Sequence, residues 1–543
     1  MTDETLDELY WRANGGKIRS AGRLPDFIID EADLPETARR LAELIAQQTI
    51  FLSNGYMPIR IVVDKNNFPR AIEVNAESVC DCAHELCSPL KIKQKKGEAP
   101  VLQRVSITRD LALRYLKGLA GRWGLKPFNG ITTSPILRGD GSIRITDGYD
   151  VETGLWCHNV PELFLPDRPT DDEACAALHR LRGFFRTFPF ADAVRRAEGD
   201  NQVVDPRVSP ALDESIFLAA LLTAVTRQSL EFAPAVLVDA PNASGAGSGK
   251  GYTIQAIMII ATGAKPAAFT GGHNMDEFEK RLTAALVQAH PGIFLDNFNA
   301  KELKSDTLAS VLTNNPAMVR PLGVTGTLPL HVRTFIGITG NAVTIAEDMA
   351  RRIINFHLDA QMEDPEQRKF EPGFLDRVLA ARSWLLTDAL MIWRWGRQRT
   401  LQPGKPMGNF EVWAQWCRDP LLALGCRDPV DRISEIKKAD PHRLAIVEFF
   451  DLWWEMHLDR IVKATDISPH VIRHIDHGAK DKTDGGLQYS RQKVTSYLDR
   501  QVGARIGGYV FSKLKLDSTT RAPAGYKLER TNIIDLRAGG ADV

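Results

Sequence analysis

The chain has 543 residues, of which 44% are apolar and 25% charged, an ordinary composition for about two to four globular domains. Lys plus Arg and Asp plus Glu each number 68, so the net charge of zero argues against a protein that coats nucleic acid over its whole surface and leaves room for local basic patches or a pore. No apolar run approaches the roughly 18 residues of a membrane span, and the acidic start of the chain is unlike a signal peptide, so we expect a cytoplasmic protein without membrane contact.

The first part of the chain predicts an α+β domain over residues 1–200. A helix is expected over 25–49, where Ala38, Leu41 and Ile45 share an apolar face, and the Asn54–Gly55 dipeptide predicts a hairpin turn. A second helix is expected over 107–123. We find no catalytic constellation in this part of the sequence.

Zinc-type ligands gather at one place in this domain: Cys80, Cys82, His84 and Cys87. Structural zinc sites usually divide their ligands between two separated pairs, whereas these four fall in one short stretch with acidic residues between them. A chance grouping on a helix is therefore the favoured interpretation, and a zinc site is the alternative.

Residues 235–264 organise the rest of the chain. A short apolar strand at 235–238 leads into a glycine-rich loop, and apolar positions recur at helical spacing after Gly251. In a strand–loop–helix arrangement of this kind, backbone N–H groups and the helix N-terminus bind phosphate, which predicts an ATP site. The alternative is a flexible linker that happens to contain Gly-Lys. The expected ATP-binding residues are Ser244, Gly245, Ala246, Gly247, Ser248, Gly249, Lys250, Gly251 and Tyr252.

This loop departs from the GxxxxGK[ST] pattern at two positions. Ser244 replaces the first glycine, and Gly251 stands where a Ser or Thr hydroxyl would bind magnesium. Magnesium would then need water, or Thr253 one step out of register, at that position.

Four more apolar stretches, at 265–270, 293–295, 334–338 and 353–358, alternate with helical patterns and predict a parallel α/β sheet with ligands at the strand ends. Asp296 follows the second stretch and is expected to hold magnesium through water. Asn341 follows the third and would orient the attacking water, while Arg351 and Arg352 are candidate arginine fingers for a neighbouring subunit's nucleotide. The alternatives are a turn or capping role for Asn341 and a solvated face for the arginines.

The motifs APNASGAGSGK, IFLDN, RPLG, TGN and ARRIINFHLDAQMEDPEQRKF occur in this order along the segment. With them the chain resembles an AAA+ ATPase of the superfamily-three helicase kind, found in primase-helicases of prophages and integrated mobile elements. The resemblance extends from about residue 24 onward and is looser at the N-terminal end. It implies an AAA+ P-loop core over 201–360, ATP and magnesium as cofactors, and self-assembly into a ring, with a hexamer expected.

The same resemblance implies a β-hairpin before the fourth strand of the sheet, whose tip grips single-stranded DNA in the ring pore. Residues 319–332 are the candidate, because Gly323, Gly326 and Pro329 lie between two short apolar stretches. Arg320, His331 and Arg333 would contact the phosphates. An ordinary surface hairpin is the alternative.

One departure concerns the general base. The family's acidic pair is Asp296 followed by Asn297 here, and relatives often carry an acid in a segment like MDEFEKRL. We therefore take Glu277 as the candidate for the missing carboxylate. The alternative is a salt-bridged, exposed helix.

The last third of the chain predicts a helical lid over 361–400, a Pro/Gly-rich linker over 401–408 and a helical plus winged-helix DNA-binding domain over 409–531. Ser490 can cap a helix that ends near Gly503, and strands are expected over 509–516 and 526–531. Such a helix and wing bind duplex phosphates. A small interaction domain with a solvated basic face is the alternative. The candidate duplex contacts are Arg491, Lys493, Arg500, Lys513 and Lys515.

These features together predict an ATP-dependent DNA helicase or translocase that acts in the replication of a prophage or integrative element. Because we find no primase site, a primase would be a separate partner. Gly251 and Asn297 keep an alternative open, a nucleotide-gated DNA-binding assembly factor with little or no hydrolysis. A nucleotide kinase fits less well, because the chain exceeds what that chemistry needs.

Overall fold

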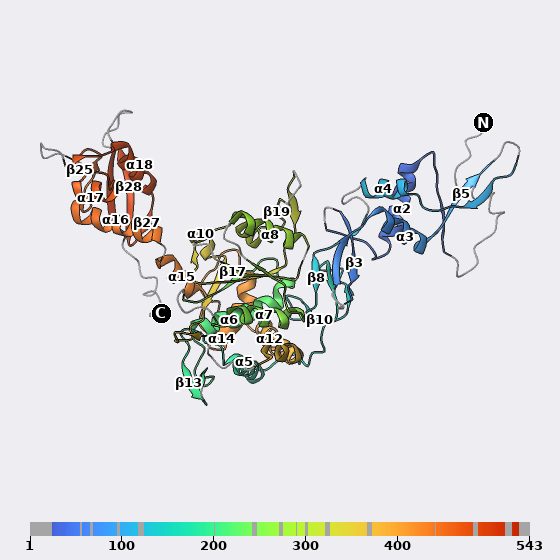
Figure 1. Cartoon of the computed structure of the whole chain (residues 1–543), viewed down its shortest axis with the longest axis horizontal. Coiled ribbons are helices and arrows are strands. Elements are labelled where there is room, and N and C mark those ends of the chain that lie inside the picture. Colours follow the sequence, from blue (N-terminus) through green and yellow to red (C-terminus); the bar gives the residue numbers. More distant parts are fainter. Residues whose placement is uncertain are drawn as a thin grey trace, which may run out of the picture. The chain divides into compact units, whose positions relative to one another are not determined.

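The structure is a computed structural model that describes residues 24–54, 57–65, 69–94, 98–117, 124–199, 201–241, 247–270, 275–288, 290–298, 302–320, 326–365, 372–439, 441–481, 487–515 and 524–531. The chain forms two compact units, Met1–Ile433 and Ser434–Val543. Figure 1 shows the elements in chain order, and each unit is described by itself below. No helix in these residue ranges is both long and apolar enough to cross a membrane.

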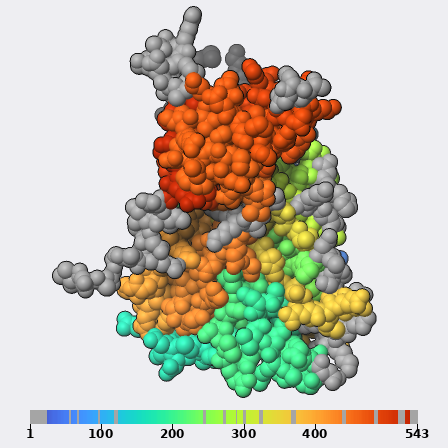
Figure 2. All heavy atoms as spheres, turned by 90° about the vertical axis from the view of Figure 1, so that its left-hand side faces the viewer, coloured from blue at the N-terminus to red at the C-terminus, as the bar shows by residue number. Residues whose placement is uncertain are grey.

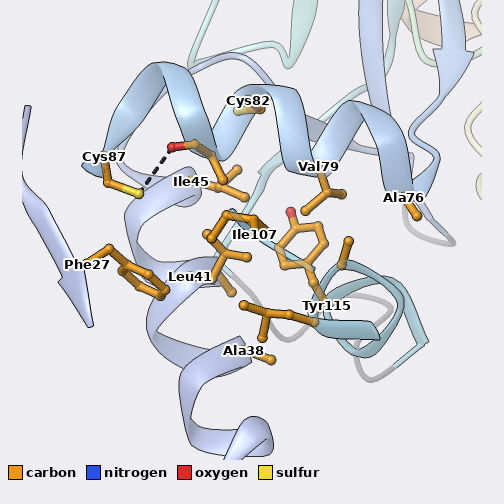
Figure 3. Packing of buried hydrophobic residues seen from close by; sticks show 14 of the residues in the cluster. Phe27, Ala38, Leu41, Ile45, Ala76, Val79, Cys82, Cys87, Ile107 and Tyr115 are labelled. Atoms are coloured by element: carbon orange, nitrogen blue, oxygen red, sulfur yellow. Dashed lines mark hydrogen bonds between the residues drawn. The ribbon is translucent and has the colours of Figure 1, made fainter. Parts of the chain in front are cut away.

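The first core of the chain is built from three helices and a small sheet. Helices α2 (Leu34–Ala46), α3 (Ala76–Leu86) and α4 (Arg109–Lys117) pack beside the sheet β1-β5-β6 (Asp26–Ile28, Ser88–Lys93, Val101–Arg104). Leu41, Ile45 and Tyr115 are fully buried between them (Figure 3). Helix α2 confirms the later part of the helix expected over 25–49, but the prediction is wrong at its start, where Asp26–Ile28 form strand β1. Helix α4 lies within the helix expected over 107–123, of which 118–123 lie outside the described residues.

The cysteines considered for zinc lie in this core. Cys82 and Cys87 are buried among apolar side chains, and Sγ of Cys87 faces the carbonyl oxygen of Ala83 at 3.1 Å (Figure 3). Nε2 of His84 lies 3.4 Å from the backbone nitrogen of Ile107. Apolar burial raises the pKa of both thiols to about 11, because the thiolate would lose its hydration. These cysteines therefore pack as small hydrophobic side chains.

A second sheet of four strands follows in the order β4-β3-β2-β7 (Pro69–Glu73, Pro58–Val63, Leu52–Ser53, Lys126–Pro127). Strands β2 and β3 are antiparallel and flank Asn54, as expected of a hairpin, although Gly55 lies outside the described residues. Short strands then lead toward the central sheet: β8 (Gly130–Thr132), β9 (Ile136–Leu137), β10 (Ile143–Arg144), β11 (Gly148–Tyr149) and β12 (Leu155–Cys157).

The central sheet has five parallel strands in the order β16-β17-β21-β15-β23 (Ala268–Thr270, Gly292–Phe298, Phe335–Gly340, Ala235–Asp239, Ile353–His357). Every residue of β15 is buried, as a central strand with covered faces requires. Each strand coincides with one of the five apolar stretches in the sequence. The predicted parallel α/β sheet is therefore confirmed.

The strand order fixes which helices cover which face. The chain leaves β15 through α7 (Lys250–Thr262) and runs to the far edge strand β16, then steps back across the sheet to β23. Because parallel crossovers are right-handed, reversing the direction moves the helices to the other face. Figure 1 accordingly shows α8 (Met275–Val287) and α10 (Glu347–Ala350) across the sheet from α7 and α6 (Leu212–Thr226). The crevice beside β15 is the position where open α/β sheets bind ligands.

Two sets of contacts cross the predicted domain boundaries. Helix α5 (Asp171–Phe185), which we assigned to the N-terminal domain, packs on α12 (Arg382–Arg397), and Nε of Arg180 donates to Asp388 at 2.9 Å. Residues 411–423, which we assigned to the C-terminal domain, form α13 (Glu411–Trp413), a π-helical turn and α14 (Asp419–Ala423) against α6 and α12. Nε1 of Trp413 donates to Oγ1 of Thr223 on α6 at 2.8 Å. Long-range packing of this kind leaves no local signal in the sequence.

The lid prediction corresponds to α11 (Phe374–Ala380) and α12, both of which pack on α7. The first unit also contains the hairpin β13-β14 (Arg195–Glu198, Asn201–Val204), helix α9 (Asp306–Thr313) and the hairpin β19-β20 (Ala317–Val319, Leu328–Leu330). A short parallel pair, β18 (Glu302–Leu303) and β22 (Thr344–Ile345), joins the ends of two loops.

The second unit begins at Ser434, within helix α15 (Val430–Ala439), and its residues have the darker orange to red colours in Figure 2. It contains α16 (Pro441–His457), α17 (Pro469–Ile475), the hairpin β25-β26 (Lys480–Asp481, Leu487–Gln488) and α18 (Arg491–Gln501). Its sheet has the order β24-β29-β28-β27 (Val462–Lys463, Ala524–Arg530, Tyr509–Lys515, Arg505–Ile506). Oγ of Ser490 accepts from the backbone nitrogen of Lys493 at 3.3 Å, so the predicted cap of α18 is present.

Candidate functional site

The glycine-rich loop joins the end of β15 to the start of α7. Gly247 and Gly249 have φ values of 71° and 98°, in the left-handed region that glycine adopts at little cost. Residues 242–246, which include Ser244, Gly245 and Ala246 of the expected ATP-binding set, lie outside the described residues. The described end of the loop leads directly into the positive end of the α7 dipole, as an anion-binding loop requires.

Lys250 opens α7 and lies near two carboxylates. Its Nζ donates to Oγ of Ser248 at 3.3 Å. Burial lowers the pKa of Lys250, and the charges of Asp239 and Asp296 oppose that shift. Asp239 ends β15, and Asp296 lies near the end of β17. The lysine is therefore held at the carboxyl ends of the strands, where a phosphate would be bound.

Asp296 is held in place by a residue that we did not select from the sequence. Oγ1 of Thr339, on the adjacent strand β21, donates to Oδ1 of Asp296 at 2.6 Å and accepts from the backbone nitrogen of Asn297 at 2.9 Å. The Thr339 side chain is buried. The TGN motif gave the only sequence signal for this contact, because the threonine lies two positions before Asn341.

The backbone bends at Asn297, which stands where the family has its second acidic residue. The pairing of β17 with β21 is irregular between Leu295 and Phe298, and Asn297 has a φ of 56° and an exposed side chain. Asn tolerates this left-handed conformation better than most residues, and a bulge of this kind redirects a side chain away from its strand.

Asn341 follows β21 beside the end of β15, where the amide of Ala342 donates to the carbonyl of Ala240 at 3.0 Å. Within the described part of the chain, Oδ1 of Asn341 is buried and has no hydrogen-bond partner. A buried acceptor without a partner costs free energy, so this atom fits a site that receives a donor from water or a ligand.

The magnesium position can be tested at Gly251. A Cβ atom placed on Gly251 would lie 3.9 Å from Oδ1 of Asp296 and in ordinary contact with its other neighbours, so the site has room for an oxygen ligand beside the carboxylate. Thr253 does not fill this role, since it is fully buried and its Oγ1 donates to the carbonyl of Gly249 at 2.9 Å. The carboxylate chemistry fits magnesium, which takes oxygen ligands.

A cavity of about 370 Å³ adjoins the loop. Its aromatic walls are Phe188, Phe374 and Tyr252, and Gly249 connects it to the phosphate-binding loop. The rings of Phe188 and Phe374 lie 5.3 Å apart at 68°, and the Arg377 guanidinium lies 5.8 Å from the Phe374 ring. Asn201 and Gln202 of the β13-β14 hairpin add polar groups. The volume suits a small-molecule ligand, and the flat aromatic walls suit a nucleobase.

The remaining catalytic candidates are exposed or bonded within their own helical segment. Arg351 is exposed after α10, and Arg352 donates to the carbonyl of Asp348. Burial lowers the pKa of Arg352, with the charge of Arg351 adding to the effect. Glu277 is 48% exposed and lies 4.0 Å from Lys280 and 3.8 Å from Arg281. The structure thus gives Glu277 the ion-paired, exposed arrangement that we named as the alternative to a general base.

The candidate contacts for single-stranded DNA lie beside the β19-β20 hairpin. Arg320 is exposed next to residues 321–325, which lie outside the described residues. Nδ1 of His331 lies 2.7 Å from Oδ1 of Asn315, and Arg333 donates to the carbonyl of Gln228 at 2.9 Å. Burial lowers the pKa of Arg333. A contact with a backbone carbonyl makes Arg333 part of the scaffold that supports the hairpin.

The duplex candidates in the second unit differ in their contacts. Lys493 pairs with Asp476 at 2.8 Å and Lys513 with Asp499 at 2.6 Å. Arg491 is exposed on α18, and Nε of Arg500 donates to the carbonyl of Ser496 at 3.2 Å. Lys515 is the last residue of β28. Arg491 and Arg500 therefore present the more accessible charge of this helix.

No protein-family model matches the chain, and no curated protein matches it. Among solved structures, the chain is similar to the C-terminal region of NrS-1, with 11% identity, a TM-score of 0.37 and coverage of 90% of this chain and 98% of the other. It is also similar to a structure described as the active helicase SCCmec type IV Cch, with 12% identity, a TM-score of 0.29 and coverage of 89% and 97%. Similarity at this level does not establish a shared fold.

Proposed function

We propose that this protein is an ATP-hydrolysing helicase or translocase that acts on DNA in the replication of a prophage or integrative element. The carrying observation is the convergence of Lys250, Asp296 and the unpartnered Oδ1 of Asn341 at the carboxyl ends of adjacent parallel strands. A nucleoside triphosphate needs a cation, a metal-holding carboxylate and a group that orients water at one place.

Each residue then has a defined task. The backbone amides of the loop and Nζ of Lys250 hold the phosphates, while a purine lies in the cavity lined by Phe188, Phe374 and Tyr252. Asp296, aimed by Thr339, holds magnesium, which when bound neutralises charge on the phosphates. Oδ1 of Asn341 accepts a hydrogen bond from the attacking water. Water attacks the terminal phosphorus directly, and ADP leaves without a covalent intermediate.

The action on DNA has separate support. The second unit runs α16, β24, α17, the short hairpin β25-β26, α18, the short strand β27 and then the two long strands β28 and β29. A helix followed by a hairpin, with exposed arginines on α18, favours a winged helix that binds duplex DNA. The exposed Arg351 is available to a neighbouring subunit, as a ring requires. A hexameric ring with single-stranded DNA in its pore, and a primase as a separate partner, complete the proposal. We expect the protein to act in the cytoplasm.

A second function is favoured by Gly251 and the exposed Asn297. Without a hydroxyl on the loop and without a second acid on β17, the site would bind ATP with little hydrolysis. The protein would then be a nucleotide-gated assembly factor on DNA, and its C-terminal unit would carry most of the function.

The test is steady-state ATP hydrolysis with and without single-stranded DNA, comparing the wild type with Lys250→Ala. Lys304→Ala, at an exposed lysine outside the site, is the matched control. DNA-stimulated turnover that disappears only in Lys250→Ala supports the motor. ATP binding that depends on Lys250, without turnover, supports the assembly factor, and hydrolysis unaffected by Lys250→Ala refutes this site.

A further inference from the structure

Gly251 leaves a space at the start of α7 that the side chains of Asp296 and Gln255 both face. A Cβ atom on Gly251 would lie 3.7 Å from Nε2 of Gln255, 3.8 Å from Cζ of Phe294 and 3.9 Å from Oδ1 of Asp296. Gln255 lies four residues further along α7, so it is on the same face of the helix as Gly251. The carboxamide of Gln255 and the carboxylate of Asp296 therefore face one point from opposite elements.

Gln255 is an unusual residue for its position. The other positions from Ile254 to Ala261 are apolar and buried, as the helix lies between the sheet and the lid helices. Gln255 itself is half-buried. At this half-buried position the amide is not enclosed by the apolar core, so a bound ligand can contact it.

The carboxamide has the chemistry that the missing hydroxyl would have supplied. Magnesium takes oxygen ligands, including carbonyl oxygens, and keeps part of its water shell when it is bound with a nucleotide. The oxygen and nitrogen of a Gln amide are assigned from their surroundings, and rotation about the last bond exchanges them. The oxygen of Gln255 can therefore face the point that Nε2 now faces.

We propose that Gln255 supplies the oxygen ligand that Gly251 lacks, so that Gln255 and Asp296 together hold the hydrated magnesium of the bound nucleotide. This inference rests on the proposed function and adds a metal-site residue to it. A serine at 251 and a glutamine at 255 would then be alternative solutions to the same requirement. The contacts of 3.7–3.9 Å around a Cβ at 251 leave room for the serine.

The test measures how tightly magnesium is bound, apart from turnover. Binding of a fluorescent ATP analogue is titrated with magnesium, and once in EDTA, for the wild type, Gln255→Leu, Gly251→Ser and the double variant. Removing a ligand-supporting group typically weakens metal affinity by about 10–100-fold. We expect Gln255→Leu to raise the half-saturating magnesium concentration by roughly tenfold or more while leaving binding in EDTA unchanged. Gly251→Ser in the same chain should restore it.

Matched controls keep the outcomes distinct. Gln288→Leu, at an exposed glutamine of the following helix region, should leave the magnesium titration unchanged, and Gln255→Glu should retain tight binding. A Gln255→Leu titration within twofold of the wild type, an equal loss in EDTA, or a loss that Gly251→Ser does not restore would each overturn the inference. Such a result leaves the ATP site standing if Lys250→Ala still abolishes hydrolysis. If Lys250→Ala is silent, the proposed function itself fails.

Discussion

Thr339 connects strand β21 to the carboxylate of Asp296, for which we propose a magnesium-holding role, and Thr339→Val tests that connection. Valine has nearly the same shape, so the change removes the hydroxyl and little else. The hydroxyl donates to Oδ1 of Asp296 at 2.6 Å and accepts from the amide of Asn297 at 2.9 Å, in a position that is 1% exposed.

The magnitude follows from these two contacts. A hydrogen bond to a charged group contributes about 1.5–3 kcal/mol net, and a neutral one about 0.5–1.5 kcal/mol. We expect the free energy of unfolding of the first unit to fall by about 2–4 kcal/mol. Asp296 would also lose its fixed orientation, so the magnesium requirement for ATP hydrolysis should rise.

Urea unfolding and a magnesium titration of turnover measure the two effects. Thr339→Ser keeps the hydroxyl and should retain most of both properties. Thr313→Val is the matched control, because its Oγ1 donates to the carbonyl of Ala309 within its own helix, at 2.9 Å. If Thr339→Val costs no more than Thr313→Val and leaves the magnesium requirement unchanged, Thr339 does not position Asp296.

Three further changes probe other parts of the molecule. Phe374→Ala removes one wall of the cavity. Because base stacking contributes about 1–3 kcal/mol, the change should weaken ATP binding by roughly 5–150-fold and leave the melting temperature of the second unit unchanged. Unchanged ATP affinity would exclude the cavity as the site of the base. Burial lowers the pKa of His357 to about 4, and the charge of Arg432 adds to this shift. The unfolded chain therefore binds this proton from about pH 6.5 downward while the folded chain does not, so the free energy of unfolding falls as pH drops from about 6.5 toward 4. Between pH 7.5 and 5, the wild type should lose roughly 1–2 kcal/mol of unfolding free energy relative to His357→Gln, and parallel pH profiles would contradict this. Arg491→Ala should weaken duplex binding and reduce its salt slope by about one, whereas an unchanged slope would remove α18 from the DNA contact.

Local patterns in the sequence were sufficient to predict the central sheet and the glycine-rich turn before α7. A buried strand needs a short apolar run, and a phosphate-binding turn needs glycines, so both leave a contiguous signal. All five predicted strands are present in a parallel sheet, and Gly247 and Gly249 take left-handed conformations that glycine adopts at little cost. The cap at Ser490 was predictable for the same reason, since cap and helix are neighbours in sequence.

The contacts of individual side chains were harder to predict than the strands, because they depend on which residues meet across the fold. Glu277 was chosen for its charge, yet it pairs with Lys280 and Arg281 on an exposed helix face. Thr253 was considered for magnesium, yet its hydroxyl is already bonded to the backbone of its own helix. A residue type and a position cannot show which partner a side chain has found.

The strands, the glycine-rich turn and a carboxylate near the end of the third strand could be predicted from the amino-acid sequence, because each is encoded in a contiguous stretch. How these parts meet depends on the tertiary fold. Thr339 and Asp296 are 43 residues apart in sequence and form a hydrogen bond. Phe188 and Phe374 come from distant segments and line one cavity, and α5 packs against the later helix α12. Such contacts arise from strand order and right-handed crossovers, which bring residues together according to the path of the chain rather than their spacing along it.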